Sequence, residues 1–230
     1  MENLQANLNL IQQRLAAASD GKYPVPKLIA VTKTHPAEDI LPLQNLGVTD
    51  IGENKVQEIM EKLPALEKNF QIHLIGRLQS NKVKYIIDHV CLIHSVDRLS
   101  LAQEIDRQAK KHGKVQDILI EVNIGGEEKK GGVAPAEVID FAKEVDKYPF
   151  VRLKGLMSVL PNVEKEALDA FYLQLSKLYD TLKQTRLDNA DIRYLSAGMS
   201  NDYDVAVKYG ANIVRLGRAL FGEREVITNG

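Results

Sequence analysis

The sequence predicts an α/β protein built as a single closed (β/α)8 TIM barrel, and two observations support this. Short runs rich in β-branched residues follow one another along the chain, and amphipathic helical patterns separate them. Strands that alternate with helices form a parallel sheet with the helices outside. We expect eight strands, at 27–33, 49–52, 71–76, 90–95, 116–123, 151–158, 192–197 and 212–217. Eight such units in about 200 residues suit a compact barrel, and a doubly wound open sheet is the alternative.

An extra helix is expected before the first strand. Within residues 1–20, Leu4, Leu8, Ile11 and Leu15 recur at helical spacing, which predicts an amphipathic helix that packs on the barrel. The charges around them do not follow the pattern of a signal or transit peptide. Further helical patterns follow the predicted strands, at 53–66, 97–112, 135–146, 164–185 and 218–221.

The composition is that of an ordinary soluble protein. The 230 residues contain 30 Lys and Arg against 31 Asp and Glu, which argues against nucleic acid or an anionic membrane as the main partner. No apolar run approaches the roughly 18–20 residues that cross a bilayer. The single cysteine excludes an internal disulfide and indicates a reducing compartment, so we expect a cytoplasmic protein. No linker or repeat divides residues 1–230, which we expect to form one domain.

Lys33 closes the first predicted strand and is the most informative residue. In a strand with a period of two, Ile29, Val31 and Lys33 share one face. A lysine at the end of a buried stripe is a candidate for Schiff-base chemistry, because apolar surroundings favour the neutral, nucleophilic amine. The alternative is a lysine that lies just past the strand and reaches water.

The loops after the seventh and eighth strands are candidates for binding a phosphate. In barrels of this type these loops, together with a helix N-terminus, often hold a phosphate group. Ser200 precedes Asn201, a candidate helix cap, and Gly217 lets a backbone N–H approach an anion closely. Each loop taken alone is equally consistent with an ordinary turn.

Arg215 interrupts a strand that is otherwise suited to a core. A buried guanidinium needs a partner, because an unpaired charge in the interior is strongly unfavourable. Glu121 is one candidate partner, since its strand places Leu119, Glu121 and Asn123 on one face. The other candidate is a ring nitrogen or a carboxylate of a ligand.

A strand-end lysine, a phosphate cradle and an inward arginine together describe a site for pyridoxal 5′-phosphate (PLP). At these residues the sequence resembles the pyridoxal phosphate homeostasis proteins, the YggS/PROSC family, which have the alanine racemase-like barrel of PLP fold type III. The resemblance runs from about residue 24 to residue 222. Its motifs lie at 30–34, 52–58, 75–82, 122–124, 155–157, 195–202, 214–217 and 221–222.

The resemblance implies a role for each predicted site residue. Lys33 would form an internal aldimine with PLP, and Ser200 with backbone groups near Gly217 would hold the phosphate. Arg215 would face the pyridine nitrogen. Because arginine does not readily give up a proton, it keeps that nitrogen unprotonated and weakens the ring as an electron sink. Three further residues are expected to line the ring: Asn54, His73 and Met157.

Three positions depart from common patterns of the family. Lys55 stands where an aromatic residue is frequent, Arg77 where a proline or histidine is frequent, and Arg218 where some relatives have a small hydroxyl residue. These departures leave the cofactor prediction intact and leave the details of ring packing and phosphate contacts open.

The resemblance favours a PLP carrier over an enzyme. A carrier would hold the cofactor reversibly and deliver it to apo-enzymes, its expected protein partners. An amino-acid racemase, the alternative, needs a second acid/base opposite Lys33, which full alanine racemases supply as a tyrosine with the help of an additional β domain. Here the barrel consumes the chain, and only Tyr203 lies near a strand end. We therefore expect a monomer without robust catalytic activity.

Two other enzyme classes are weaker alternatives. A cofactor-free lyase of the aldolase type would use Lys33 with Glu121 for proton transfer. A hydrolase is disfavoured because residues 198–202 lack the final glycine of a nucleophile elbow. The five histidines show no paired spacing, so no metal site is expected.

Overall fold

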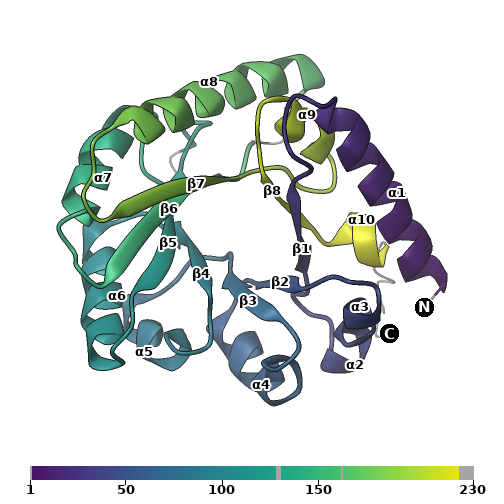
Figure 1. Ribbon diagram of the computed structural model, residues 1–230, viewed down its shortest axis with the longest axis horizontal. Helices are drawn as coiled ribbons and strands as arrows, with labels where there is room; N and C mark the ends of the chain where they lie inside the picture. The colour runs from purple at the N-terminus through teal and green to yellow at the C-terminus, as the bar shows by residue number, and fades with distance from the viewer. Residues whose placement is uncertain (1, 128–130, 162, 223–230) are drawn as a thin grey trace, which may run out of the picture.

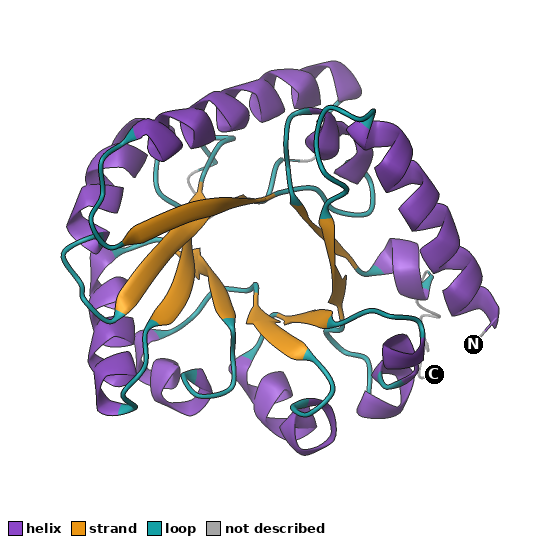
Figure 2. Ribbon diagram, in the orientation of Figure 1, coloured by secondary structure: helices purple, strands orange, loops and turns teal. Residues whose placement is uncertain are grey.

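A computed structural model describes residues 2–127, 131–161 and 163–222 of the chain. Its eight strands form a closed parallel barrel in sequence order, which confirms the predicted fold and excludes the open sheet. Figure 1 and Figure 2 show the helices arranged around the outside of this barrel. The strands are β1 (Lys27–Val31), β2 (Asp50–Glu53), β3 (Gln71–Leu74), β4 (Leu92–Val96), β5 (Gln116–Val122), β6 (Val151–Ser158), β7 (Ala190–Ser196) and β8 (Ile213–Leu216).

The long helices lie where the hydrophobic periodicity predicts them. The sequence did not reveal the short helices between β1 and β2 or between β3 and β4, because four residues are too few to show a helical period. The helices are α1 (Glu2–Ser19), α2 (Ala37–Ile40), α3 (Pro42–Asn45), α4 (Val56–Leu66), η1 (Ser80–Lys82), α5 (Val83–Ile86), α6 (Leu99–Lys111), η2 (Pro135–Glu137), α7 (Val138–Val145), α8 (Lys165–Gln184), α9 (Tyr203–Lys208) and α10 (Arg218–Phe221). None of the helices in this part of the chain is long and apolar enough to cross a membrane.

The N-terminal helix packs on the barrel as predicted. Leu8, Ile11 and Leu15 are buried, and α1 lies against α9 and α10 (Figure 1). The side-chain amide of Asn7 donates a hydrogen bond to the carbonyl of Leu220 at 2.9 Å. α1 therefore supports the short helices that follow β7 and β8.

The interior of the barrel contains both apolar and polar side chains. A small apolar cluster there is formed by Ile29, Leu92, Leu119, Met157 and Ile213. Four buried polar residues lie on β3, β4, β7 and β8: His73, His94, Ser196 and Arg215. Inward-facing positions alternate along barrel strands, so both sets share the space that the sheet encloses.

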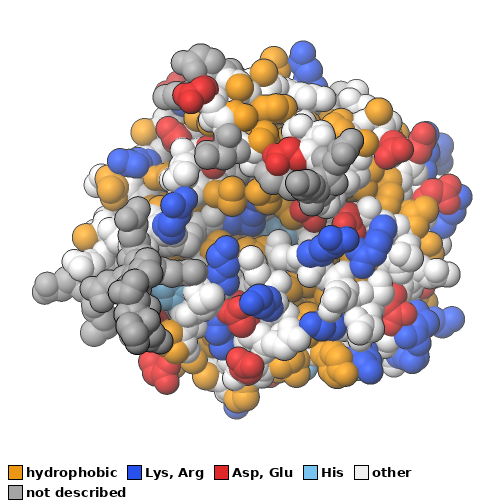
Figure 3. All heavy atoms as spheres, turned by 180° about the vertical axis from the view of Figure 1, so that it is seen from behind, with side chains coloured by type: hydrophobic (Ala, Val, Ile, Leu, Met, Phe, Trp, Pro, Cys, Tyr) orange, Lys and Arg blue, Asp and Glu red, His pale blue; other side chains and the backbone are white. Residues whose placement is uncertain are grey.

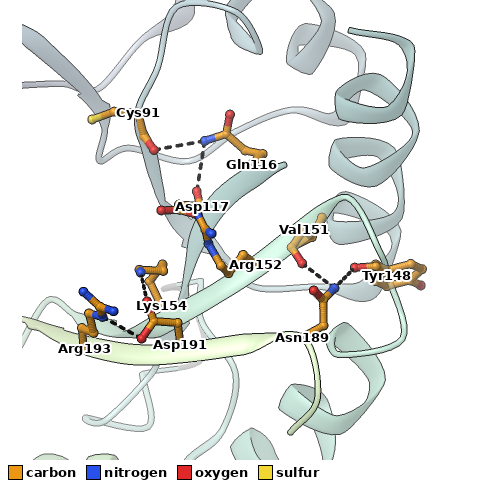
Figure 4. Close-up of polar contacts among 10 residues, drawn as sticks. All are labelled: Cys91, Gln116, Asp117, Tyr148, Val151, Arg152, Lys154, Asn189, Asp191 and Arg193. Atoms are coloured by element: carbon orange, nitrogen blue, oxygen red, sulfur yellow. Dashed lines mark hydrogen bonds and ion pairs between the residues drawn. The ribbon is translucent and has the colours of Figure 1, made fainter. Parts of the chain in front are cut away.

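Polar contacts join the amino-terminal parts of β5, β6 and β7 (Figure 4). Arg152 on β6 pairs with Asp117 on β5, with 2.7 Å between Nε and Oδ1. Lys154 on β6 pairs with Asp191 on β7, and the amide of Asn189 donates to the backbone carbonyls that precede and begin β6. These contacts fasten three strands at the end of the barrel where they begin.

Candidate functional site

A cavity of about 740 Å³ lies at the carboxyl ends of the strands. Four of the seven predicted site residues line it together: Lys33, Ser200, Arg215 and Gly217. Leu160, from the loop after β6, and Leu168, from α8 (Lys165–Gln184), contribute apolar lining. The face shown in Figure 3, opposite to the view of Figure 1, carries Lys and Arg side chains gathered around its middle.

Lys33 follows the last residue of β1 by two positions. Lys33 is exposed, so it does not continue the buried stripe of Ile29, and the alternative of a lysine just past the strand is the one observed. The reason is local, because β1 ends at Val31 and the backbone turns at Thr34, which has a φ of +65°. The side chain of Lys33 nevertheless lines the same cavity as the ends of β7 and β8.

A partly buried polar cluster fixes the backbone on both sides of Lys33. The hydroxyl of Thr32 donates to Glu53 Oε1 at 2.6 Å, and Lys62 donates to the same oxygen at 2.7 Å and to the Thr32 carbonyl at 2.9 Å. The N–H of Thr34 donates to Glu58 Oε2 at 2.6 Å. Sequence reasoning missed this cluster, and its only signal was the i,i+4 spacing of Glu58 and Lys62.

Ser200 connects the loops that follow β7 and β8. Its Oγ accepts a hydrogen bond from the N–H of Ala219 in α10 at 3.0 Å. Arg218 reaches back across the same junction, where its Nη2 donates to Asn201 Oδ1 at 3.4 Å. Ser200, Arg218 and Gly217 all line the cavity, so donors from both loops face one space.

The loop after β7 differs in one detail from the prediction. Helix α9 begins at Tyr203, so Asp202 and not Asn201 precedes it. Asp202 Oδ1 accepts the N–H of Met199 at 2.7 Å, which closes the turn that presents Ser200. Gly198 enters this turn with a φ of +94°, a conformation that favours glycine.

Arg215 is held by backbone carbonyls and a hydroxyl. It is 4 % exposed, and its Nη1 donates to the carbonyl and to Oγ of Ser196, at 2.8 and 2.7 Å. Its Nη2 donates to the carbonyl of Ser158 at 2.8 Å. Glu121 is not within ion-pair distance of Arg215 among the residues described. Burial raises the pKa of Glu121 even though the charge of Arg215 opposes this.

The other three predicted residues do not line this cavity. Asn54 follows β2, and its backbone lies so close to Gly76 that a Cβ there would collide with it. Met157 is 1 % exposed in the apolar cluster inside the barrel. Both ring nitrogens of His73 have partners within the barrel, as expected for a core histidine. Contacts of these three with a cofactor ring stay predictions.

The chemistry of the cavity suits PLP. It combines the amine of Lys33, which can react with an aldehyde, with hydroxyl and guanidinium donors at the junction of the last two loops. A second guanidinium, that of Arg215, is buried and fixed in orientation. The cavity volume also lies within the usual range for small-molecule sites, roughly 300–1,000 Å³.

Comparisons with known proteins agree with this geometry. The family model described as the N-terminal domain of alanine racemase matches residues 1–225. A curated relative from Aquifex aeolicus, named pyridoxal phosphate homeostasis protein, is 44 % identical over 97 % of this chain and 98 % of its own. The structure of PipY from Synechococcus elongatus with PLP bound is 33 % identical, with a TM-score of 0.80 over 92 % of this chain and 100 % of that one.

Full-length racemases share only the fold. An alanine racemase from Clostridium difficile gives a TM-score of 0.79 at 19 % identity, over 97 % of this chain and 56 % of that one. The curated relatives, in contrast, match along nearly their whole length. The chain therefore belongs to the family of pyridoxal phosphate homeostasis proteins.

Proposed function

We propose that this protein binds PLP reversibly through Lys33 and delivers it to apo-enzymes in the cytoplasm. The observation that carries the proposal is that Lys33, Ser200, Arg215 and Gly217 line one cavity at the carboxyl ends of the strands. The names of the curated relatives and the PLP bound to PipY support the same cofactor.

Each lining residue has a defined task in this proposal. The amine of Lys33 would hold PLP through its aldehyde carbon, with loss of one water. Ser200, the N–H groups near Gly217 and the guanidinium of Arg218 bind the phosphate. Arg215 donates to the pyridine nitrogen and leaves that nitrogen unprotonated, because arginine holds its own proton. When bound, PLP supplies an electrophilic carbon and an electron sink that Arg215 weakens.

The exposure of Lys33 favours a carrier over a catalyst. Enzymes that stabilise carbanions exclude water from the reacting carbon, whereas a cofactor held by a solvent-exposed residue such as Lys33 would stay accessible to water or to an incoming amine. In addition, no tyrosine lines the cavity among the residues that the structure describes, so the acid/base that full alanine racemases place opposite the lysine has no counterpart in this lining. We propose that the carrier works as a monomer.

Borohydride trapping of the cofactor tests the role of Lys33. We expect the protein loaded with PLP to be yellow and, after reduction, to carry the cofactor on the peptide that contains Lys33. Lys33→Ala should lose all fixed cofactor. Lys27→Ala is the matched control, because Lys27 begins the same strand at the other end of the barrel, and it should retain fixed cofactor. Equal labelling of the two variants would contradict the assignment.

Delivery and racemisation need separate measurements. Loaded protein is mixed with an apo-enzyme and a trap for free PLP, and activity should return faster than release into solution allows. Recovery of activity at the rate of free release would mean that the protein stores PLP but does not deliver it. Incubation with L-alanine in deuterium oxide should give neither D-alanine nor deuterium at Cα, and turnover of either kind would favour the racemase instead.

A further inference from the structure

A chain of hydrogen bonds crosses the barrel interior and ends on Arg215. Asp50 Oδ1 lies 2.9 Å from His73 Nε2, and His73 Nδ1 lies 3.0 Å from His94 Nε2. His94 Nδ1 in turn lies 3.1 Å from Ser196 Oγ, to which Arg215 Nη1 donates at 2.7 Å. All five residues are buried, and they come from β2, β3, β4, β7 and β8.

The two ends of the chain determine the direction of every bond in it. The Arg215 guanidinium only donates, so Ser196 Oγ accepts from it and directs its own proton to His94 Nδ1. An ionised Asp50 only accepts, so His73 carries its proton on Nε2 and has a lone pair on Nδ1. His94 must then donate from Nε2 to His73. A single arrangement of protons, in which both histidines are neutral and protonated on Nε2, gives every donor in the chain of hydrogen bonds an acceptor.

The charges along the chain agree with this arrangement. Burial alone would raise the pKa of Asp50, but hydrogen bonds from His73, Thr49 and Lys27 outweigh it and hold this pKa well below its ordinary value. Burial lowers the pKa of both His73 and His94, and the positive charge of Arg215 adds to the effect at His94. A carboxylate, two neutral imidazoles and a guanidinium are therefore the expected states.

We propose that Asp50, His73, His94 and Ser196 are positioning residues for Arg215. The hydrogen-bond chain orients the guanidinium toward the cavity, and its three hydrogen bonds leave one N–H of Nη2 and the N–H of Nε for the pyridine nitrogen of PLP. This proposal rests on the proposed function for the role of Arg215. It also gives residues of the barrel interior a role in tuning the cofactor, although none of these four residues lines the cavity.

The Asp50 end of the hydrogen-bond chain lies at the opposite end of the barrel from the cavity. Asp50 and His73 line a small space of about 170 Å³ there, and Lys27 donates to Asp50 at 2.9 Å. Lys27 has 45 % of its side chain exposed, so the carboxylate is neutralised from the solvent side. The chain thus runs from a solvent-facing ion pair to the buried arginine.

The first test is NMR spectroscopy on the protein without cofactor. Long-range ¹H–¹⁵N spectra should show both His73 and His94 as neutral rings protonated on Nε2, from about pH 6 to pH 8, with assignments from the His73→Gln and His94→Gln variants. An Nδ1-protonated or doubly protonated ring at either position would overturn the proposal. This result does not depend on PLP binding, so it remains informative if the proposed function fails.

The second test compares two buried serines. Ser196→Ala removes the hydroxyl that joins His94 to Arg215, and we expect a shifted absorption band of bound PLP and an affinity about three- to tenfold weaker. Ser95→Ala is the matched control, because this hydroxyl is equally buried on β4 and donates at 2.6 Å to the carbonyl of Gly76, outside the chain.

Three outcomes separate positioning from a structural role. Ser95→Ala should leave the band unchanged and the affinity within about twofold, whatever its effect on stability. Ser196→Thr, which keeps the hydroxyl, should restore the parent band. If Ser196→Ala binds PLP with the parent band and affinity, the chain only stabilises the fold and the proposal is wrong. Absence of PLP binding by the parent protein would instead refute the proposed function.

Discussion

The pKa values of buried acids shift in opposite directions at the two ends of the barrel, and strand β2 has one acid at each end. Asp50 begins this strand and Glu53 ends it, and both are at most 4 % exposed. Hydrogen bonds outweigh burial at Asp50 and lower its pKa, whereas burial outweighs the bonds from Lys62 and Thr32 at Glu53 and raises its pKa. Glu53 Oε2 has no hydrogen-bond partner among the residues described.

This contrast separates a fastened end from an end that is prepared for a ligand. Where the strands begin, charges are paired across β5, β6 and β7, as Figure 4 shows. Where they end, donors such as Arg215 and Arg218 face a cavity. The paired end joins neighbouring strands through partly exposed ion pairs, and the open end presents donors to a cavity that suits a cofactor.

Replacement of one arginine at each end of the barrel should give the largest difference in the free energy of unfolding. Arg215→Leu leaves the carbonyls of Ser196 and Ser158 without their donor, and we expect it to lower the free energy of unfolding by about 3 kcal/mol. Arg152→Leu at the fastened end breaks a largely exposed pair and should cost under about 0.5 kcal/mol. Urea denaturation of both variants measures the difference, and equal midpoints would remove the distinction between the two ends.

Two glycines provide a smaller contrast in backbone strain. A methyl group at Gly198, near the cavity, would meet the Cβ of Ala206 at 2.8 Å in addition to the strain of a positive φ. Gly113, in the turn before β5, also has a positive φ but nothing within 4 Å. We expect Gly198→Ala to destabilise by about 2 kcal/mol and Gly113→Ala by about 1 kcal/mol. Thermal or urea unfolding of the pair checks the order, and a greater loss at Gly113 would contradict it.

The pH dependence of stability should have opposite signs for the two acids of β2. The lowered pKa of Asp50 gives stability that is present above its unfolded value of 3.8 and is lost as pH falls below it. The raised pKa of Glu53 gives stability that is present below 4.5 and is lost as pH rises through the folded value.

Two amide variants measure these contributions. From about pH 5 to pH 3, the stability of the parent relative to Asp50→Asn should shrink. As pH rises above about 4.5, the stability of the parent relative to Glu53→Gln should shrink as well. Denaturation curves across this range provide the comparison, and parallel pH profiles for both variants and the parent would show that neither carboxylate is perturbed by folding.

The sequence predicted those parts of the site that follow from topology. Parallel strands end at one face of a barrel, so Lys33, Ser200, Arg215 and Gly217 had to approach one another once eight strands were assigned. It could not show where β1 ends, because that depends on the turn at Thr34, so it left a buried and an exposed Lys33 as alternatives. The contact of His73 with His94 was equally hidden, since 21 residues separate two positions that only the register of β3 and β4 brings together.

The hydrogen bonds that fix the backbone on both sides of Lys33 have a consequence for crystal-soaking experiments. Because Thr32 and Thr34 are each held by their own hydrogen bonds to Glu53 and Glu58, the flexible stem of the lysine is all that has to move at this strand end when the amine reacts. Crystals grown from the empty protein should therefore turn yellow on soaking without loss of diffraction from this part of the molecule.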